Sequence, residues 1–292
     1  MSESFRRFLD NLQEAIEWCE SIGIRLSTSR FAEYVDTVER ELTKIKDPPS
    51  QSDLIVFHTA LTAIEAGSEL ILIKRALSNL VSPDLVSRLK QYVGGTTLEV
   101  SESHVDNTQH PRNFGFELVL AAQLAEGGLP VEFPPNGDIL IKKPFIQIEC
   151  KRLQSESNIS GAFKKAVRQL ALRKSIGQYT TNIVAISVGK VIHRGEYFLT
   201  APDSVSLDKG LSSILNKFRL KHAYIWNQRP MKHVQAVLLH ISTYIHVTAN
   251  NTWLWGTYAI LNQLNHNCSA RQERDLKSVV VALKSIATTA KY

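Results

Sequence analysis

Cysteines and long apolar runs are scarce in this 292-residue sequence. Its three cysteines, Cys19, Cys150 and Cys268, lie far apart, so their spacing predicts neither a disulfide framework nor a zinc site. No apolar run approaches the roughly 20 residues that a membrane-spanning helix needs, and the N-terminal residues contain no signal-peptide core. These absences predict a cytoplasmic protein that does not enter a membrane.

Several motifs of common enzyme classes are also absent. The sequence contains no glycine-rich phosphate-binding loop, which argues against ATP hydrolysis by this chain. It contains no Gly-x-Ser-x-Gly and no His-Glu-x-x-His, which argues against the common serine hydrolases and zinc proteases. Any catalytic activity must therefore depend on another arrangement of residues.

Acidic residues are missing from one long segment. None occurs between Asp208 and Glu273, although the net charge of the whole chain is only +6. A basic segment of this kind favours a polyanionic partner, and the alternative is an ordinary solvated surface. The basic residues of this segment are Lys209, Lys217, Arg219, Lys221, Arg229, Lys232 and Arg271.

The apolar fraction of 43% is ordinary for a globular protein and predicts a buried core. Residues 1–95 show helical spacing of apolar residues, and we expect them to form an all-helical module. Regulation, oligomerisation and partner binding are all open as its role. Its predicted helices cover about residues 5–19, 30–46, 52–79 and 85–92.

Residues 96–292 alternate between helical and extended patterns, which indicates a second domain of the α/β class. Residues 191–199 read as an irregular strand or loop, and residues 252–261 read as an edge strand or the start of a helix. Predicted helices cover about 113–126, 158–176, 206–221 and 270–290, and predicted strands cover about 131–133, 138–142, 145–152, 183–188 and 234–247.

Two predicted strands carry a set of charged residues that can support chemistry. Glu149 and Lys151 are two residues apart, so they point to the same face of their strand. Asp138 joins them if the two strands pair through the Lys142–Pro144 turn. The two carboxylates could then hold a hard cation such as Mg²⁺, which Glu117 in the preceding helix could help to bind. The alternative is an ordinary salt-bridged strand.

A basic helix follows this pair of strands. Lys164, Lys165, Arg168 and Arg173 lie largely off its apolar stripe. Such residues can contact phosphates, which supplies affinity for nucleic acid without reading its sequence. A solvated helix face is the alternative interpretation.

These motifs together resemble the PD-(D/E)xK nuclease superfamily, which has the restriction-endonuclease-like fold. The match consists of Asp138, ten intervening residues and Glu149-Cys150-Lys151, after the helical Glu117. It covers about residues 114–188, and beyond them it rests on element order alone. One difference is that Gly137 precedes Asp138 where the family has a proline.

The resemblance implies an α/β/α core with a mixed central sheet, preceded by the all-helical module. It implies that Asp138, Glu149 and Glu117 are metal ligands and that Lys151 is the catalytic lysine. The expected cofactor is Mg²⁺, for which Mn²⁺ would substitute. Gln169 matches an auxiliary glutamine of the family, and we expect it to bind nucleic acid together with the basic helix and Arg152.

We therefore expect a metal-dependent endonuclease that cuts DNA. The resemblance suggests a role in antiviral defence. The helical module could keep the nuclease silent until a partner such as a helicase is engaged. Cutting both strands needs a dimer or two sequential nicks, and we expect a two-fold homodimer. One alternative is a protein of the same fold that binds nucleic acid or a partner without cutting. Another is a nuclease directed at RNA.

Overall fold

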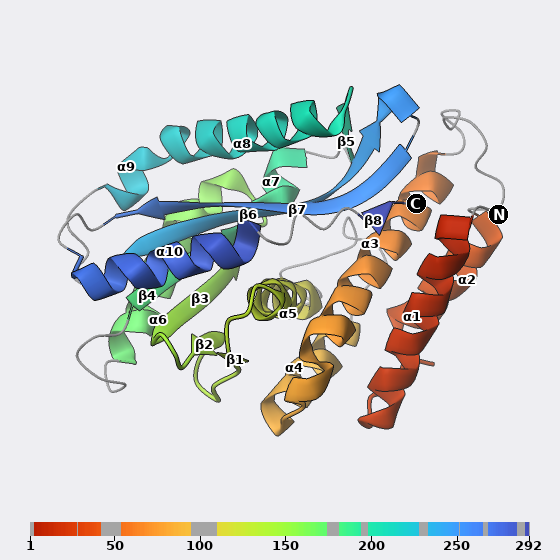
Figure 1. The fold of residues 1–292 in the computed structure, drawn as a ribbon, viewed down its shortest axis with the longest axis horizontal. Helices are drawn as coiled ribbons and strands as arrows, with labels where there is room; N and C mark the ends of the chain where they lie inside the picture. The colour runs from red at the N-terminus through yellow and green to blue at the C-terminus, as the bar shows by residue number, and fades with distance from the viewer. Residues whose placement is uncertain are drawn as a thin grey trace. The chain divides into compact units, whose positions relative to one another are not determined.

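The computed structural model describes residues 3–27, 29–41, 54–94, 110–173, 181–193, 198–227, 233–250, 252–264, 268–284 and 290–291. The chain forms two compact units (Figure 1). The first comprises Met1–Ala122, Trp253–Trp255 and Ala290–Tyr292, and the second comprises Gln123–Thr252 and Gly256–Thr289. The predicted boundary between residues 95 and 96 lies outside the described residues. The division by compactness instead assigns most of helix α5 (His110–Glu126) to the first unit.

The first unit is mainly helical, as the sequence predicts. Apolar residues at helical spacing bury one face of each amphipathic helix, and the 3-10 turn η2 (Ser78–Leu80) extends the third helix. Ser82 caps the fourth helix by accepting a hydrogen bond from the backbone N–H of Leu85, and Pro83 occupies its first turn. Besides the start of α5, the helices are α1 (Glu3–Ser21), α2 (Arg30–Glu41), α3 (Leu54–Leu77) and α4 (Pro83–Val93).

A buried arginine lies in the core of this unit. The guanidinium of Arg30 lies 5.5 Å from the ring centre of Phe31 and 5.1 Å from that of Tyr92. The hydroxyl of Tyr92 donates a hydrogen bond of 2.9 Å to Glu69. Burial and the nearby Glu69 raise the pKa of Tyr92, so its hydroxyl remains a donor at physiological pH.

The second unit is built on a mixed sheet with the strand order β1-β2-β3-β4-β6-β7, in which β5 also pairs with β6. The pairs β1–β2 and β2–β3 are antiparallel, whereas β3–β4, β4–β6 and β5–β6 are parallel. The strands are β1 (Val131–Glu132), β2 (Ile139–Ile141), β3 (Ile146–Arg152), β4 (Thr181–Ser187), β5 (Phe198–Ala201), β6 (Ala236–Val247) and β7 (Thr252–Gln263). A short strand, β8 (Ala290–Lys291), pairs with β7 at Leu254 and Trp255.

Helices cover both faces of this sheet. Thr181 pairs with Ile146, and its hydroxyl donates a hydrogen bond of 2.7 Å to Asp275 of α10 (Ala270–Lys284). Helix α10 therefore lies on the face opposite Glu149, because neighbouring residues of β3 point to opposite sides. The Glu149 face is covered by α6 (Ile159–Leu172), whose residue Phe163 packs against Trp226 of α9 (Ala223–Trp226). The remaining elements are η4 (Glu156–Asn158), α7 (Gly189–His193), α8 (Ser204–Lys221) and η5 (Thr248–Asn250).

A close approach of two backbones fixes α10 beside the end of α5. Gly127 follows α5, and a Cβ atom placed on it would overlap the Cβ, the Cα and the carbonyl oxygen of Ala282. Only glycine leaves enough space here for the two segments to meet.

The prediction of an α/β fold with a helical N-terminal region is confirmed. Residues 252–261, for which the sequence allows a strand or a helix start, belong to β7. For residues 191–199 the sequence predicts an irregular strand or loop, but α7 ends at His193 and β5 begins at Phe198. Helix α5 begins at His110, earlier than the predicted start at about residue 113. No helix in the described part of the chain is both long and apolar enough to cross a membrane.

Candidate functional site

The predicted hairpin of β2 and β3 brings Asp138 and Glu149 together. Ile139 pairs with Ile148, so Asp138 lies opposite Glu149 at the edge of this ladder. The Oδ2 atom of Asp138 accepts a hydrogen bond of 2.6 Å from the backbone N–H of Cys150. Two carboxylates on neighbouring strands are thus held by the sheet itself.

Glu149 is the most buried charge of this cluster, with a side chain that is 0% exposed. Its Oε1 atom lies 2.5 Å from Nζ of Lys151, and its Oε2 atom lies 2.5 Å from Nη1 of Arg173. Lys151 also donates a hydrogen bond of 2.9 Å to the carbonyl oxygen of Cys150. A buried carboxylate is costly without such partners, and here two cations neutralise it.

The electrostatics of Asp138 differ from those of an exposed aspartate. Burial, and then the charge of Glu149, raise its pKa from 3.8 to about 6. Lys151, the N–H of Cys150 and Arg173 act in the opposite direction. Asp138 therefore changes charge close to neutral pH, which is common for carboxylates in functional sites.

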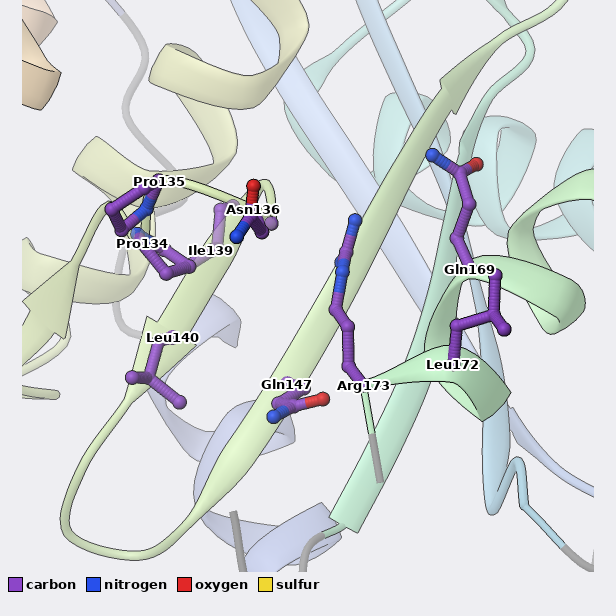
Figure 2. A pocket seen from close by; sticks show the side chains of 10 residues that line it. Pro134, Pro135, Asn136, Ile139, Leu140, Gln147, Gln169, Leu172 and Arg173 are labelled. Carbon is purple, nitrogen blue, oxygen red and sulfur yellow. The ribbon is translucent and has the colours of Figure 1, made fainter. Parts of the chain in front are cut away.

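A pocket of about 550 Å³ lies beside this cluster. Figure 2 shows the loop before β2 on one side of it and the end of α6 on the other, with β2 and β3 between them. Its volume falls in the range of ligand-binding clefts. The pocket is lined by Pro134, Pro135, Asn136, Gly137, Ile139, Leu140, Gln147, Gln169, Leu172 and Arg173.

Arg173 joins the cluster to the pocket. It pairs with Glu149 and also packs on Gly137, where a Cβ atom would lie 3.1 Å from Nη1 of Arg173 and 2.9 Å from Cγ of Pro134. A side chain at position 137 would therefore crowd Pro134 and require the guanidinium to shift by a few tenths of an ångström. The sequence predicts that Arg173 contacts phosphate, and its observed partner is the buried carboxylate.

The other predicted residues of α6 form two neighbouring rows. Lys164 and Arg168 are exposed and lie in one row along the helix, with four residues from each to the next. The next residue of this row is Leu172, which lines the pocket. Lys165 is also exposed and leads in the same way to Gln169 and Arg173. A basic helix face therefore runs toward the pocket, as the sequence suggests.

Two further predicted site residues have surroundings of their own. Arg152 follows Lys151 on β3, and the alternation of the strand directs it to the opposite face of the sheet. Glu117 belongs to the first unit, where its Oε2 atom lies 3.4 Å from Nε of Arg88. This ion pair gives Glu117 a structural partner, and its role as a metal ligand stays a prediction.

The donor atoms of the cluster can be compared with the needs of Mg²⁺. Within the described ranges, no group of three or more His, Cys, Asp or Glu side chains is arranged to hold a metal ion. Mg²⁺ commonly keeps several waters and binds through one or two carboxylates together with substrate phosphates. Asp138 and Glu149 supply two carboxylates of this kind, so the donor chemistry fits such an ion, which would have to replace Lys151 or Arg173 at Glu149.

Sequence reasoning missed two parts of this site. Gln147 lies two residues before Glu149 on the same strand face, and the strand period alone would have indicated it. The ion pair between Arg173 and Glu149 has no such signal, because it joins residues 24 positions apart through the packing of α6 on the sheet.

Comparisons with models of protein families, with curated proteins and with solved structures found no match to this chain.

Proposed function

We propose that this protein is a metal-dependent nuclease that hydrolyses phosphodiester bonds, and that it is a distant member of the PD-(D/E)xK superfamily. The observation that carries the proposal is the arrangement of Asp138, Glu149 and Lys151 on two paired strands. The element order α5-β1-β2-β3-α6-β4 supports it, because the resemblance rests on this order as well as on the motif.

In this proposal Asp138 and Glu149 hold a Mg²⁺ ion. When bound, such an ion polarises a phosphate and lowers the pKa of a coordinated water. The chain itself contributes a rigid strand pair that fixes both carboxylates before substrate arrives. The N–H of Cys150 orients Asp138, and Lys151 and Arg173 orient Glu149.

Lys151 is the proposed catalytic residue of the chain. Its ammonium group lies beside the buried acid and remains partly accessible, with 18% of the side chain exposed. A cation in this place can stabilise the charge that develops on a phosphate during attack. It can also orient the attacking water.

The exposed basic row of α6 supports nucleic acid as the substrate. Lys164, Lys165 and Arg168 can contact successive phosphates along the helix, which leads to the cluster. We propose DNA as the first substrate to test and endonucleolytic cleavage as the reaction. Activation by a partner such as a helicase, a two-fold dimer and a role in antiviral defence remain predictions from the sequence.

The test is cleavage of plasmid DNA, single-stranded DNA and RNA by the purified protein, with Mg²⁺ or with EDTA. We expect Mg²⁺-dependent cleavage, and a loss of about 100-fold or more in Asp138→Asn and in Lys151→Met. Lys142→Met is the matched control, because Lys142 lies on the same hairpin but pairs at the surface with Glu132. Equal cleavage by wild type and by both site variants would refute the proposal.

One observation favours a second candidate, a protein that binds nucleic acid without cutting it. Both carboxylate oxygens of Glu149 already have cationic partners, Lys151 and Arg173. If these ion pairs persist in Mg²⁺, the cluster is structural. Salt-sensitive DNA binding without cleavage on any of the substrates would support this candidate.

A further inference from the structure

The pocket beside the cluster has a composition that selects one part of a nucleotide. We propose that it binds a single unpaired nucleobase of the substrate, adjacent to the phosphate that is cut. The inference rests on the proposed nuclease function and adds to it a class of substrate, namely nucleic acid with an unpaired base at the cleavage site.

Charge at the pocket argues against a phosphate as its occupant. Of the residues that line it, Arg173 alone carries a charge, and its Nη1 atom is bound to Glu149. The remaining walls are apolar or carry amides. An anion would therefore find no uncompensated cation among these lining residues, whereas a flat neutral ring would be well accommodated.

The opposing walls suit such a ring. Pro134 and Pro135 lie on one side of the pocket and Leu172 lies on the other (Figure 2), while the guanidinium of Arg173 lies against Gly137. Bases that have left a stack are held between apolar side chains or on the plane of an arginine. Leu172 is 85% exposed, so its side chain is accessible to a ligand in the pocket.

Amide groups supply the polar contacts that a base requires. Gln169 lines the pocket, and its buried Oε1 atom accepts no hydrogen bond from the described residues. Gln147 is only 6% exposed, yet it also lines the pocket, and Asn136 lies at its rim. Adenine, cytosine and guanine carry exocyclic amines that can donate to such an acceptor.

The position of the pocket connects it to the reaction. Gly137 lines the pocket and precedes Asp138, while Arg173 lines the pocket and contacts Glu149. A base held here keeps its own phosphate beside the carboxylates. In a duplex the base must first leave the stack, at a cost of a few kcal/mol, so single-stranded or locally opened substrates should bind better.

The test is a scan of short single strands in which each nucleotide in turn lacks its base. Binding is measured by fluorescence anisotropy in EDTA, and cleavage of the same strands is measured in Mg²⁺. We expect one abasic position to weaken binding about tenfold, since contacts to one base contribute about 1–3 kcal/mol. The bond cut should lie next to that position.

Two variants assign the effect to the pocket. Leu172→Ala and Gln169→Leu should weaken binding of the intact strand while leaving binding of the sensitive abasic strand unchanged. Leu220→Ala is the matched control, because Leu220 is 63% exposed on α8 and does not line the pocket. Leu172 is so exposed that its truncation should not unfold the protein.

The outcomes separate the two proposals. An equal effect of every abasic position, with cleavage intact, refutes the base pocket and leaves the nuclease in place. A position-dependent binding profile without cleavage supports the pocket and refutes the nuclease. Absence of binding to any strand refutes both.

Discussion

At the scale of single residues, the neutralisation of Glu149 is the feature on which the cluster depends. Its carboxylate is fully buried and its two partners are each about one fifth exposed, 18% for Lys151 and 20% for Arg173. Water can therefore replace a lost cation only in part. The stability of the hairpin and its chemistry are coupled through these three side chains.

Replacing Arg173 should expose this coupling. We expect Arg173→Gln to lower the free energy of unfolding by about 1–3 kcal/mol, because Glu149 keeps only Lys151 as its cationic partner. Arg168→Gln is the control, since Arg168 is exposed one turn away, and it should stay within about 0.5 kcal/mol of wild type. Urea denaturation in EDTA measures the unfolding free energies of both variants. Equal stabilities for the two variants would mean that the ion pair contributes nothing.

Asp138 should impose a pH dependence on stability. Its pKa is about 6 in the folded protein and near 3.8 otherwise, so the folded state binds more protons between these values. Its contribution is therefore fully present below pH 3.8 and is lost as the pH rises through about 6.

Asp138→Asn removes this titration and keeps an oxygen that can accept from Cys150. Relative to wild type, the variant should gain on the order of 1–3 kcal/mol in unfolding free energy as the pH rises across this window. Denaturation in EDTA at a series of pH values measures the difference. If the unfolding free energies of wild type and Asp138→Asn changed in parallel with pH, the raised pKa of Asp138 would be contradicted.

The residues of the site differed in how well sequence could find them. Asp138, Glu149 and Lys151 follow from strand period and from one turn, which are local properties of the chain. The contact of Arg173 with Glu149 and the role of Pro134 at the pocket wall depend on where α6 packs. Such packing is set by the whole sheet, and no local pattern encodes it.

At the scale of elements, α6 connects the sheet to the surface. Ile159, Phe163, Ala166 and Leu170 are buried, while the basic rows lie on its exposed side. The helix therefore packs through one face and can present three cations to a polyanion through the other.

Substitution of these cations should change the salt dependence of binding. We consider the triple variant Lys164→Ala, Lys165→Ala, Arg168→Ala. A plot of the logarithm of its binding constant against the logarithm of salt concentration should be less steep than that of wild type, by about 0.7–0.9 for each phosphate contact removed. Lys209→Ala with Lys217→Ala is the control, because both lysines are exposed on α8. Binding of DNA in EDTA at several salt concentrations gives the slopes. A larger effect from the control pair would move the interface to α8.

Element prediction succeeded where the periodic signal was long. The long helices and the buried strands β4 and β6 have clear apolar patterns, and their positions follow from the sequence. The short elements α7 and β5 do not, since four or five residues are too few to display a period. β7 was ambiguous because its aromatic-rich pattern fits a strand and a helix start equally well.

At the scale of the whole molecule, metal binding should appear as stability. A ligand that binds only the folded state at ten times its dissociation constant adds about 1.4 kcal/mol. We therefore expect Mg²⁺ to raise the melting temperature of wild type by roughly 2–4 °C. Asp138→Asn should show no such rise.

The same experiment examines Glu117. If Glu117 is a metal ligand, Glu117→Gln should lose the response to Mg²⁺ as Asp138→Asn does. If it serves only its ion pair with Arg88, the variant should melt earlier but respond normally. Scanning calorimetry with Mg²⁺ or EDTA distinguishes these results. An unchanged melting temperature of wild type in Mg²⁺ would argue against the metal site itself.

The division into two units was only partly predictable. The helical character of the first unit follows from composition and period. The sequence does not predict that Trp253–Trp255 and Ala290–Tyr292 belong to the first unit, because contacts between residues so distant in the chain have no local signature.

The meeting of Gly127 with Ala282 has a consequence for which substitutions evolution or engineering can accept. A library randomised at position 127 and selected for folded protein should return glycine alone, because any Cβ atom would collide with α10. Gly161 in α6 and Gly210 in α8 have open space where a methyl group would stand, so alanine there should raise unfolding free energy by about 0.5–1 kcal/mol. The glycines of this chain thus range from irreplaceable at position 127 to improvable at positions 161 and 210, and libraries randomised at each of these positions would rank them.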